Sequence, residues 1–274
     1  MKGADRHSLI KWMIFGWLGW RKIMGRITIL GTASAVSSGK HENTHLIIEE
    51  EGHYVLVDCP GNPIARLDQA KINPLDINDL IITHFHPDHV SGFSLFLMES
   101  WLMARKKSLN VYGNEFTITR LKKMMALFGW ERWPDFFEVI FYIVPEKNLH
   151  SIIDNDVMLI QTSPGKHLIP TIGIRVQFKR HKKVVVYSSD TEFCDAIGEL
   201  ADGADCLIHE AAGPDEGHSS AEEAGMIAAK ANAQKLYLIH YPIQNNFEWM
   251  QTQAKRHYSG QVIVAEDFMQ IDVI

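Results

Sequence analysis

One short histidine-rich string constrains this chain more than any other feature of its sequence. The string THFHPDH spans Thr83–His89 and directly follows an apolar strand expected at Leu80–Ile82. Its His-x-His pair places two imidazoles on the same side of an extended backbone, because side chains alternate along a strand. Three imidazoles and a carboxylate this close repel when protonated and need partners when neutral, and a metal ion such as zinc resolves both problems. The string therefore predicts metal ligands at His84, His86, Asp88 and His89.

The bulk composition fits one folded domain. The 274 residues, 46% of them hydrophobic, suffice for a large α/β domain, and a charged content of 22% argues against disorder. The net charge of −6 disfavours a protein that grips a long nucleic acid by charge alone. The three cysteines, Cys59, Cys194 and Cys206, form no CxxC pair and predict free thiols in a reducing compartment, so we expect a cytoplasmic protein.

The first 24 residues differ in character from the rest. Residues 8–24 read SLIKWMIFGWLGWRKIM, and their apolar part is too short and too interrupted by Lys11 for a membrane span of about 20 residues. An interfacial helix is one interpretation. The other is that MGRITILG, from Met24, is a natural start that runs straight into a strand. We favour the second, with residues 1–23 as an extension and residues 24–274 as the folded domain.

Apolar runs and turn residues outline the expected elements. Strands are predicted at Ile27–Leu30, Leu46–Ile48, Tyr54–Val57, Leu80–Ile82, Leu109–Tyr112, Ile174–Phe178, Val184–Tyr187, Cys206–Ile208, Leu236–Ile239 and Val262–Ala265. Helices are predicted at Pro63–Ala70, Glu115–Phe128, Ser220–Ala233 and Phe247–Tyr258. Two groups of strands with helices between them predict an α/β fold, a two-sheet sandwich flanked by helices. Trp130 and Trp133 could line a substrate entrance, although core packing is the favoured interpretation.

The string HxHxDH resembles the signature of the metallo-β-lactamase superfamily. The resemblance implies an αββα sandwich of two mixed β-sheets and a centre for two divalent metal ions. It assigns His167, in SPGKHLIP, as the third ligand of the first metal and Asp190, in VVVYSSDT, as the bridging carboxylate. It assigns His240, in LYLIHY, as the last ligand of the second metal and Asp58, in YVLVDCP, as the aspartate that supports the ligands. Aspartate at position 190 differs from the cysteine of antibiotic-hydrolysing β-lactamases and disfavours that subtype.

Two later segments resemble the ribonuclease Z (tRNase Z) branch of the superfamily. CLIHEAA, at Cys206–Ala212, is similar to its HEAT motif, and HSSA, from His218, is similar to its HST motif. The resemblance covers nearly all of Arg26–Val273 and implies that Glu210 and His218 act as a pair that delivers a proton to the leaving oxygen. It also implies a homodimer.

Several departures leave a tRNA substrate open. His167 and Asp190 are only 23 positions apart, which leaves no room for the long tRNA-binding arm of bacterial ribonuclease Z. The segment between them has a basic turn, 179–183, in place of that arm. Segments 37–44 and 241–245 also lack the residues that the family uses to contact tRNA or phosphate. We expect the chemistry to be kept while the natural substrate is undetermined.

The predicted enzyme is a metal-dependent hydrolase, a phosphodiesterase or ribonuclease Z-like endonuclease. A hydroxide that bridges two metal ions would attack phosphorus, with Asp88 and Asp190 fixing and deprotonating it. His218, backed by Glu210, would then protonate the leaving group. Zinc is the favoured metal, although manganese and iron accept the same ligands. The alternatives are a lactone, ester or thioester hydrolase of the same fold and a non-catalytic metal-binding sensor.

Overall fold

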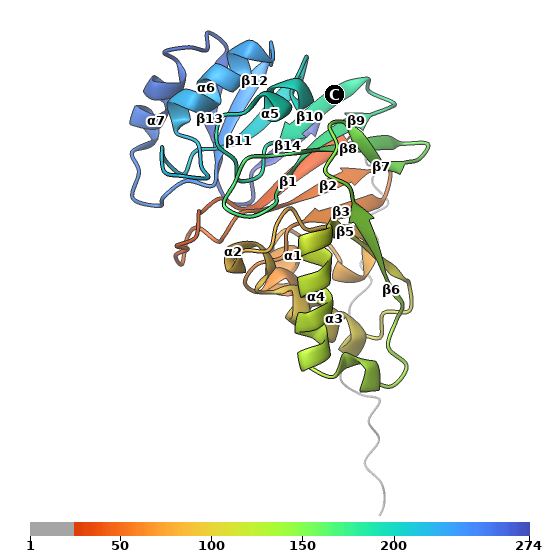
Figure 1. The fold of residues 1–274 in the computed structure, drawn as a ribbon. Helices are drawn as coiled ribbons and strands as arrows, with labels where there is room; N and C mark the ends of the chain where they lie inside the picture. The colour runs from red at the N-terminus through yellow and green to blue at the C-terminus, as the bar shows by residue number, and fades with distance from the viewer. Residues whose placement is uncertain (1–24) are drawn as a thin grey trace, which may run out of the picture.

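The computed structural model describes residues 25–274, so the expectations for residues 1–23 lie outside the described part of the chain. Two seven-stranded β-sheets pack face to face and helices cover their outer faces (Figure 1). The first sheet has the order β14-β1-β2-β3-β4-β5-β6. Its strands are β1 (Gly25–Gly31), β2 (His45–Glu50), β3 (His53–Val57), β4 (Ile77–Ile81), β5 (Leu109–Asn114), β6 (Val139–Val144) and β14 (Gln270–Val273).

The second sheet is built entirely from the second half of the chain. Its order is β13-β12-β11-β10-β9-β8-β7. Its strands are β7 (His150–Asp154), β8 (Met158–Pro164), β9 (Ile172–Phe178), β10 (Lys183–Tyr187), β11 (Cys206–Glu210), β12 (Lys235–Ile239) and β13 (Gln261–Val264). Both sheets mix parallel and antiparallel pairs, as predicted.

The helices divide between the two outer faces. Those on the first sheet are α1 (Pro63–Gln69), α2 (Pro87–Val90), α3 (Phe93–Leu102) and α4 (Glu115–Leu127), with short 3-10 turns at Pro74–Asp76 and Trp130–Arg132. Those on the second sheet are α5 (Asp195–Leu200), α6 (Ala221–Lys230) and α7 (Phe247–Ala254). Asn62 caps α1, because its side chain accepts a hydrogen bond from the backbone N–H of Ala65.

Three apolar cores hold these layers together. The largest lies between the sheets and includes Ile48, Val57 and Ile174, whose side chains face inward from their strands. The other two lie between each sheet and its own helices. This arrangement is the αββα sandwich that the sequence predicts. None of the helices between Gly25 and Ile274 combines the length and the apolar character that a bilayer crossing requires.

The strand directions bring many loops to one edge of the sandwich. β3 and β4 run parallel to each other, and β10, β11 and β12 also run parallel. β8 joins that direction because it is antiparallel to β9, which is antiparallel to β10. The carboxyl ends of these strands therefore meet at a common edge, where ligands bind in many α/β proteins.

Candidate metal centre

The predicted site residues follow strand ends of both sheets. Asp58 follows β3, the Thr83–His89 string follows β4, and His167 follows β8. Asp190 follows β10 and His240 follows β12 in the second sheet. Although these residues are spread over more than 180 positions, the fold brings the predicted ligands together at the common edge.

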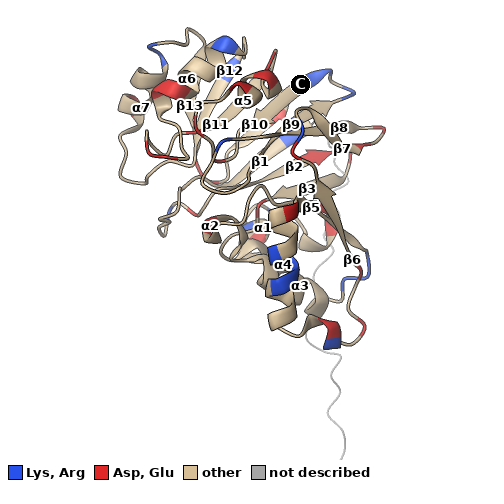
Figure 2. Cartoon of the chain, viewed as in Figure 1, with Lys and Arg blue, Asp and Glu red and all other residues tan. Residues whose placement is uncertain are grey.

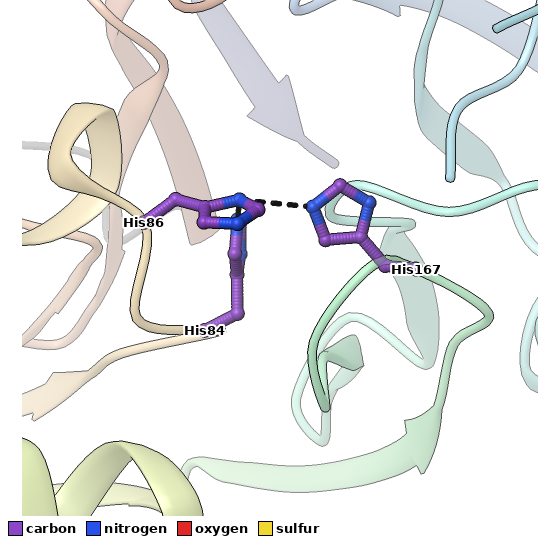
Figure 3. Close-up of side chains that lie close together, drawn as sticks. All are labelled: His84, His86 and His167. Atoms are coloured by element: carbon purple, nitrogen blue, oxygen red, sulfur yellow. Dashed lines mark hydrogen bonds between the residues drawn. The ribbon is translucent and has the colours of Figure 1, made fainter. Parts of the chain in front are cut away.

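The first group contains three imidazoles. Nδ1 of His86 lies 3.1 Å from Nε2 of His84 and 3.0 Å from Nε2 of His167, so the three rings converge on one point (Figure 3). Nitrogen ligands of a tetrahedral zinc ion lie about 3.3 Å from one another. The two separations from Nδ1 of His86 are close to that spacing, which suits a divalent ion.

The second group contains two carboxylates and two imidazoles, Asp88, His89, Asp190 and His240, whose ligand atoms all lie within 4.8 Å of one another. Oδ2 of Asp190 lies 3.1 Å from Nε2 of His240 and 3.4 Å from Nε2 of His89. It also lies 3.7 Å from Nε2 of His84, in the first group. Asp190 thus stands between the groups, where the resemblance assigns the bridging carboxylate.

Most of the ring nitrogens that face away from the centre have a polar partner. Nδ1 of His89 lies 2.8 Å from Asp58, and Nδ1 of His84 lies 3.0 Å from Oγ1 of Thr83. Asp58 is itself fixed by the backbone N–H and hydroxyl of Thr83. Nδ1 of His167 faces the carbonyl of Gly217, 2.5 Å away, and these contacts hold the rings in one orientation.

Charges within the centre compensate one another. Burial alone would lower the pKa of His89 and raise that of Asp190. The attraction between them, helped by Asp58 and His240, instead raises the pKa of His89 well above its usual value and holds that of Asp190 well below its own. Burial lowers the pKa of His84 well below its usual value, which keeps this ring neutral, the form that binds metals.

The donor set fits divalent metal ions. Oδ1 of Asp190 is fully buried and has no hydrogen-bond partner among residues 25–274, and the buried Nε2 of His89 has only carboxylate oxygens of Asp190 and Asp88 near it, at 3.4 and 3.5 Å. A buried polar atom without a partner destabilises a fold by about 1–3 kcal/mol, and a cation at this place would satisfy both atoms. Nitrogen and carboxylate donors of this kind suit zinc and its neighbours.

The backbone at three of the strand ends adopts the left-handed region. Asp58, Ser189 and His240 have φ values of 61°, 56° and 52°. Residues other than glycine rarely adopt this region, and such strain concentrates at functional sites. In this chain the bends immediately follow β3, β10 and β12, where the chain turns sharply to bring Asp58, Asp190 and His240 into the centre.

Beside the metal-ligand set lies the predicted proton-transfer pair. Nδ1 of His218 is 3.1 Å from Oε1 of Glu210, at the end of β11. Glu210 is fully buried and also accepts hydrogen bonds from the backbone N–H groups of Thr191 and Ala212. Burial raises the pKa of Glu210, and although burial also opposes the charge of His218, the neighbouring carboxyl raises the pKa of that imidazole. The ring of His218 packs 4.9 Å from that of His167, so the pair borders the first group.

Several supporting groups escaped prediction from the sequence. Oγ1 of Thr44 lies 3.3 Å from Nδ1 of His240, although the two residues are 196 positions apart, and no spacing or motif indicates that contact. The contact between His167 and the backbone carbonyl of Gly217 could not be predicted either, because no side chain takes part on the glycine's side. Thr83 could have been found, because it stands within the histidine-rich string and directly after a strand.

The fold and the site together define a metal-dependent hydrolase of the metallo-β-lactamase fold. The model of the Anti-Pycsar protein Apyc1 family matches residues 25–261, and the chain belongs to that family.

Relatives and solved structures agree with this class. The chain is 28% identical over 283 residues to Ribonuclease Z of Mycobacterium sp. (strain KMS), an alignment that covers 91% of this chain and 96% of the relative. The metallo-β-lactamase fold protein YhfI from Bacillus subtilis superposes with a TM-score of 0.78 at 20% identity, over 92% of this chain and 100% of that one. Human tRNase Z, short form, has a TM-score of 0.74 at 23% identity, over 91% and 99% of the two chains.

These findings confirm the predicted superfamily, its ribonuclease Z-like branch and the class of metal-dependent hydrolase. The centre is one for divalent metal ions. The roles of the individual residues stay predictions and enter the proposal below.

Proposed function

We propose that the chain is a phosphodiesterase of the ribonuclease Z-like type that uses two divalent metal ions, with zinc favoured over manganese and iron. The observation that carries the proposal is the buried Glu210 bonded to His218 beside the metal-ligand set. Alkoxides leave phosphorus poorly without a proton, so a positioned donor of this kind suits phosphodiester cleavage. The Ribonuclease Z relatives support the same chemistry.

The proposed ligand assignment follows the two groups. His84, His86 and His167 hold the first ion, and Asp88, His89 and His240 hold the second, with Asp190 between them. Ions held there supply Lewis acidity, which lowers the pKa of water to about 7 and stabilises negative charge on phosphoryl oxygens.

The side chains perform the remaining steps. Asp88 and Asp190 orient the attacking water and accept its proton. Nδ1 of His218 is hydrogen-bonded to the carboxyl group of Glu210, so Nε2 is the ring nitrogen that is left to donate a proton to the substrate. As the bond between phosphorus and the leaving oxygen breaks, this proton passes to that oxygen, and the products are an alcohol and a phosphate monoester.

The charges of the chain favour a compact phosphodiester over a long RNA. In the basic turn, Lys179, Arg180 and Lys183 each pair with a carboxylate. Lys166, the lysine next to the ligand His167, pairs with Glu192. Paired cations neutralise few phosphates, so these four add little to the electrostatic attraction that binds long nucleic acids. An RNA substrate, which the names of the relatives suggest, is the alternative within the phosphodiesterase class.

One observation favours a second candidate, a lactone, ester or thioester hydrolase. Tyr241, which follows His240, is fully buried, and its hydroxyl donates a hydrogen bond to the carbonyl of Ala265. This side chain therefore does not face a phosphate. Carbonyl substrates would need the metal centre but little from His218. A non-catalytic sensor is the least supported alternative, since the predicted ligand set is complete.

The test measures hydrolysis by the metal-loaded chain of four substrate types: aryl and nucleoside phosphodiesters, an aryl carboxylic ester, a lactone and an unprocessed tRNA. The proposal expects diester turnover that falls in His218→Ala, while His257→Ala, a surface histidine paired with Glu222, retains it. Ester or lactone opening without diester turnover would establish the second candidate instead. Cleavage of tRNA would extend the substrate range to RNA.

Three broader expectations belong to the proposal. They are the division into an N-terminal extension, 1–23, and one hydrolase domain, 24–274; a cytoplasmic location; and a homodimer.

A further inference from the structure

The segment that follows Asp190 connects two neighbouring loops. The backbone N–H of Glu192 donates a hydrogen bond to the carbonyl of Lys166, at 2.7 Å, in the loop between β8 and β9. The hydroxyl of Ser219, in the loop between β11 and α6, donates a hydrogen bond to the carbonyl of Thr191 at 2.6 Å. The first of these loops carries a predicted metal ligand, and the second carries the predicted proton donor.

The side chain of Glu192 makes a further contact between the same two loops. Its Oε1 accepts a hydrogen bond from the backbone N–H of Gly217 at 3.1 Å, and its Oε2 pairs with the side chain of Lys166. Gly217 is buried, and Glu192 is the only partner of its N–H among residues 25–274. Because a buried N–H without a partner destabilises a fold, the carboxylate determines where this backbone group lies.

Gly217 in turn orients a predicted metal ligand. Its carbonyl lies 2.5 Å from Nδ1 of His167, whose Nε2 faces His86 in the first group (Figure 3). The hydrogen bond at one ring nitrogen decides which nitrogen is free to bind a metal ion. The φ of Gly217 is 85°, and a Cβ at this position would lie 2.9 Å from Nδ1 of His167. This close approach requires glycine.

The hydrogen bonds within the loop of Gly217 do not hold the glycine against His167. The backbone N–H groups of Gly213 and His218 donate to carbonyls of the same loop, so these bonds close the loop on itself. The bond to Glu192 differs, because it comes from outside the loop and reaches the glycine directly.

We infer that Glu192 is a positioning residue of the metal centre: it holds Gly217 so that the glycine carbonyl orients His167 toward the first group. Its carboxylate forms no hydrogen bond with a predicted ligand within residues 25–274, so it acts through the glycine. The ion pair with Lys166 is secondary, because that lysine side chain is 67% exposed and exposed ion pairs contribute little. The inference rests on the ligand assignment in the proposed function.

The test measures the stepwise zinc affinities of the full chain by competition with a chelator. His167→Ala identifies the ion held by the first group, because it should weaken that ion most. Glu192→Ala should weaken the same ion about tenfold, the lower end of the range for groups that orient ligands, and leave the other ion within about twofold. Its side chain is only partly buried and its backbone bond to Lys166 is kept, so the variant should fold, as circular dichroism would check.

Three control variants separate positioning from other effects, and each should keep the wild-type affinities. Glu192→Gln retains an oxygen that accepts from Gly217, and Lys166→Met removes only the ion pair. Asp154→Ala removes another carboxylate that pairs with a lysine, Lys179, at the end of β7. Figure 2 shows the acidic turn between β7 and β8 in red, at the end of β8 opposite to the metal edge.

The inference is wrong if Glu192→Ala leaves the affinity for that ion unchanged, or if it weakens both ions equally. It is also wrong if Lys166→Met or Glu192→Gln weakens the ion as much as Glu192→Ala, because the ion pair would then be the cause. If wild-type protein holds no ion that His167→Ala weakens, the ligand assignment fails and this inference fails with it. None of these measurements uses catalysis, so a failure of the proposed reaction is a separate result.

Discussion

Replacing His218 by alanine tests the proton-transfer pair most sharply. Glu210 keeps two backbone N–H donors, from Thr191 and Ala212, at 2.7 and 3.1 Å, so its buried carboxylate is not left without partners. The His218 side chain is 22% exposed, so its loss leaves no closed cavity. We therefore expect a stably folded variant that retains its metals and loses only the proton donor.

The size of the effect depends on the leaving group. A positioned general acid contributes about 10²–10⁴-fold, which corresponds to about 3–5 kcal/mol of barrier. A dinucleoside phosphate, whose leaving group is an alkoxide, should show that loss in kcat/KM. A p-nitrophenyl diester, whose leaving group departs without a proton at neutral pH, should lose less than about tenfold.

The assay compares both diesters in wild type, His218→Ala and His257→Ala, with metal content measured on the same samples. Equal losses on the two substrates would refute the proton-donor role. Loss of metal from His218→Ala would also refute it, because the residue would then act as a ligand or hold one in place.

Three further predictions concern residues that support the candidate site or stabilise the fold around it. Asp58→Asn should weaken metal affinity about 10–100-fold, measured by competition with a chelator, and unchanged affinity would contradict its supporting role. Gly225→Ala should lower the free energy of unfolding by about 1–3 kcal/mol, because its Cβ would lie 2.2 Å from a carbonyl of α7. Gly198→Ala, whose Cβ would have 3.6 Å of space, is the control in thermal melts and should be neutral or stabilising. Burial lowers the pKa of His45 to about 3 and that of His209 to about 4, so the unfolded chain binds protons more readily below pH 6.5. Unfolding in urea should therefore show stability falling by up to about 2 kcal/mol per histidine between pH 6.5 and 5, and less so in His209→Gln; a flat profile would contradict this.

Sequence analysis identified the residues that the structure brings together at the candidate centre better than the groups around them. The string Thr83–His89 concentrates ligands in seven positions, so it needed no knowledge of the fold. The distant positions proposed as ligands, His167, Asp190 and His240, each follow an apolar strand, and the resemblance assigns them in that order along the chain. The contact between Thr44 and His240 could not be predicted, because it depends on how the two sheets pack.

The middle of the chain was predicted least well. β6, β7 and β8 were not predicted, and β6 (Val139–Val144) is a continuous apolar run with no alternation that follows a Trp-rich helical region. α3 (Phe93–Leu102) was also missed. Its own apolar residues lie on most of its faces, so its sequence shows little helical periodicity. Trp130 and Trp133 pack against the core of the first sheet, which confirms the favoured interpretation.

The basic turn shows a different limit of sequence analysis. Lys179, Arg180 and Lys183 form a run that is typical of anion binding. Their partners Asp154, Glu51 and Asp205 lie 25, 129 and 22 positions away, so no local pattern reveals that these charges are already paired. Two of these pairs form between elements of the second sheet, and the Arg180–Glu51 pair joins the two sheets, so the folded structure is needed to show them.

The central claim is a centre for two metal ions built from these seven ligands, and counting the ions tests it most directly. Inductively coupled plasma mass spectrometry on zinc-loaded, dialysed protein should find two ions per chain. The double variant His86→Ala, His167→Ala should retain about one, because Asp88, His89, Asp190 and His240 are untouched. A wild-type chain that holds at most one ion, or a double variant that still holds two, would contradict the account.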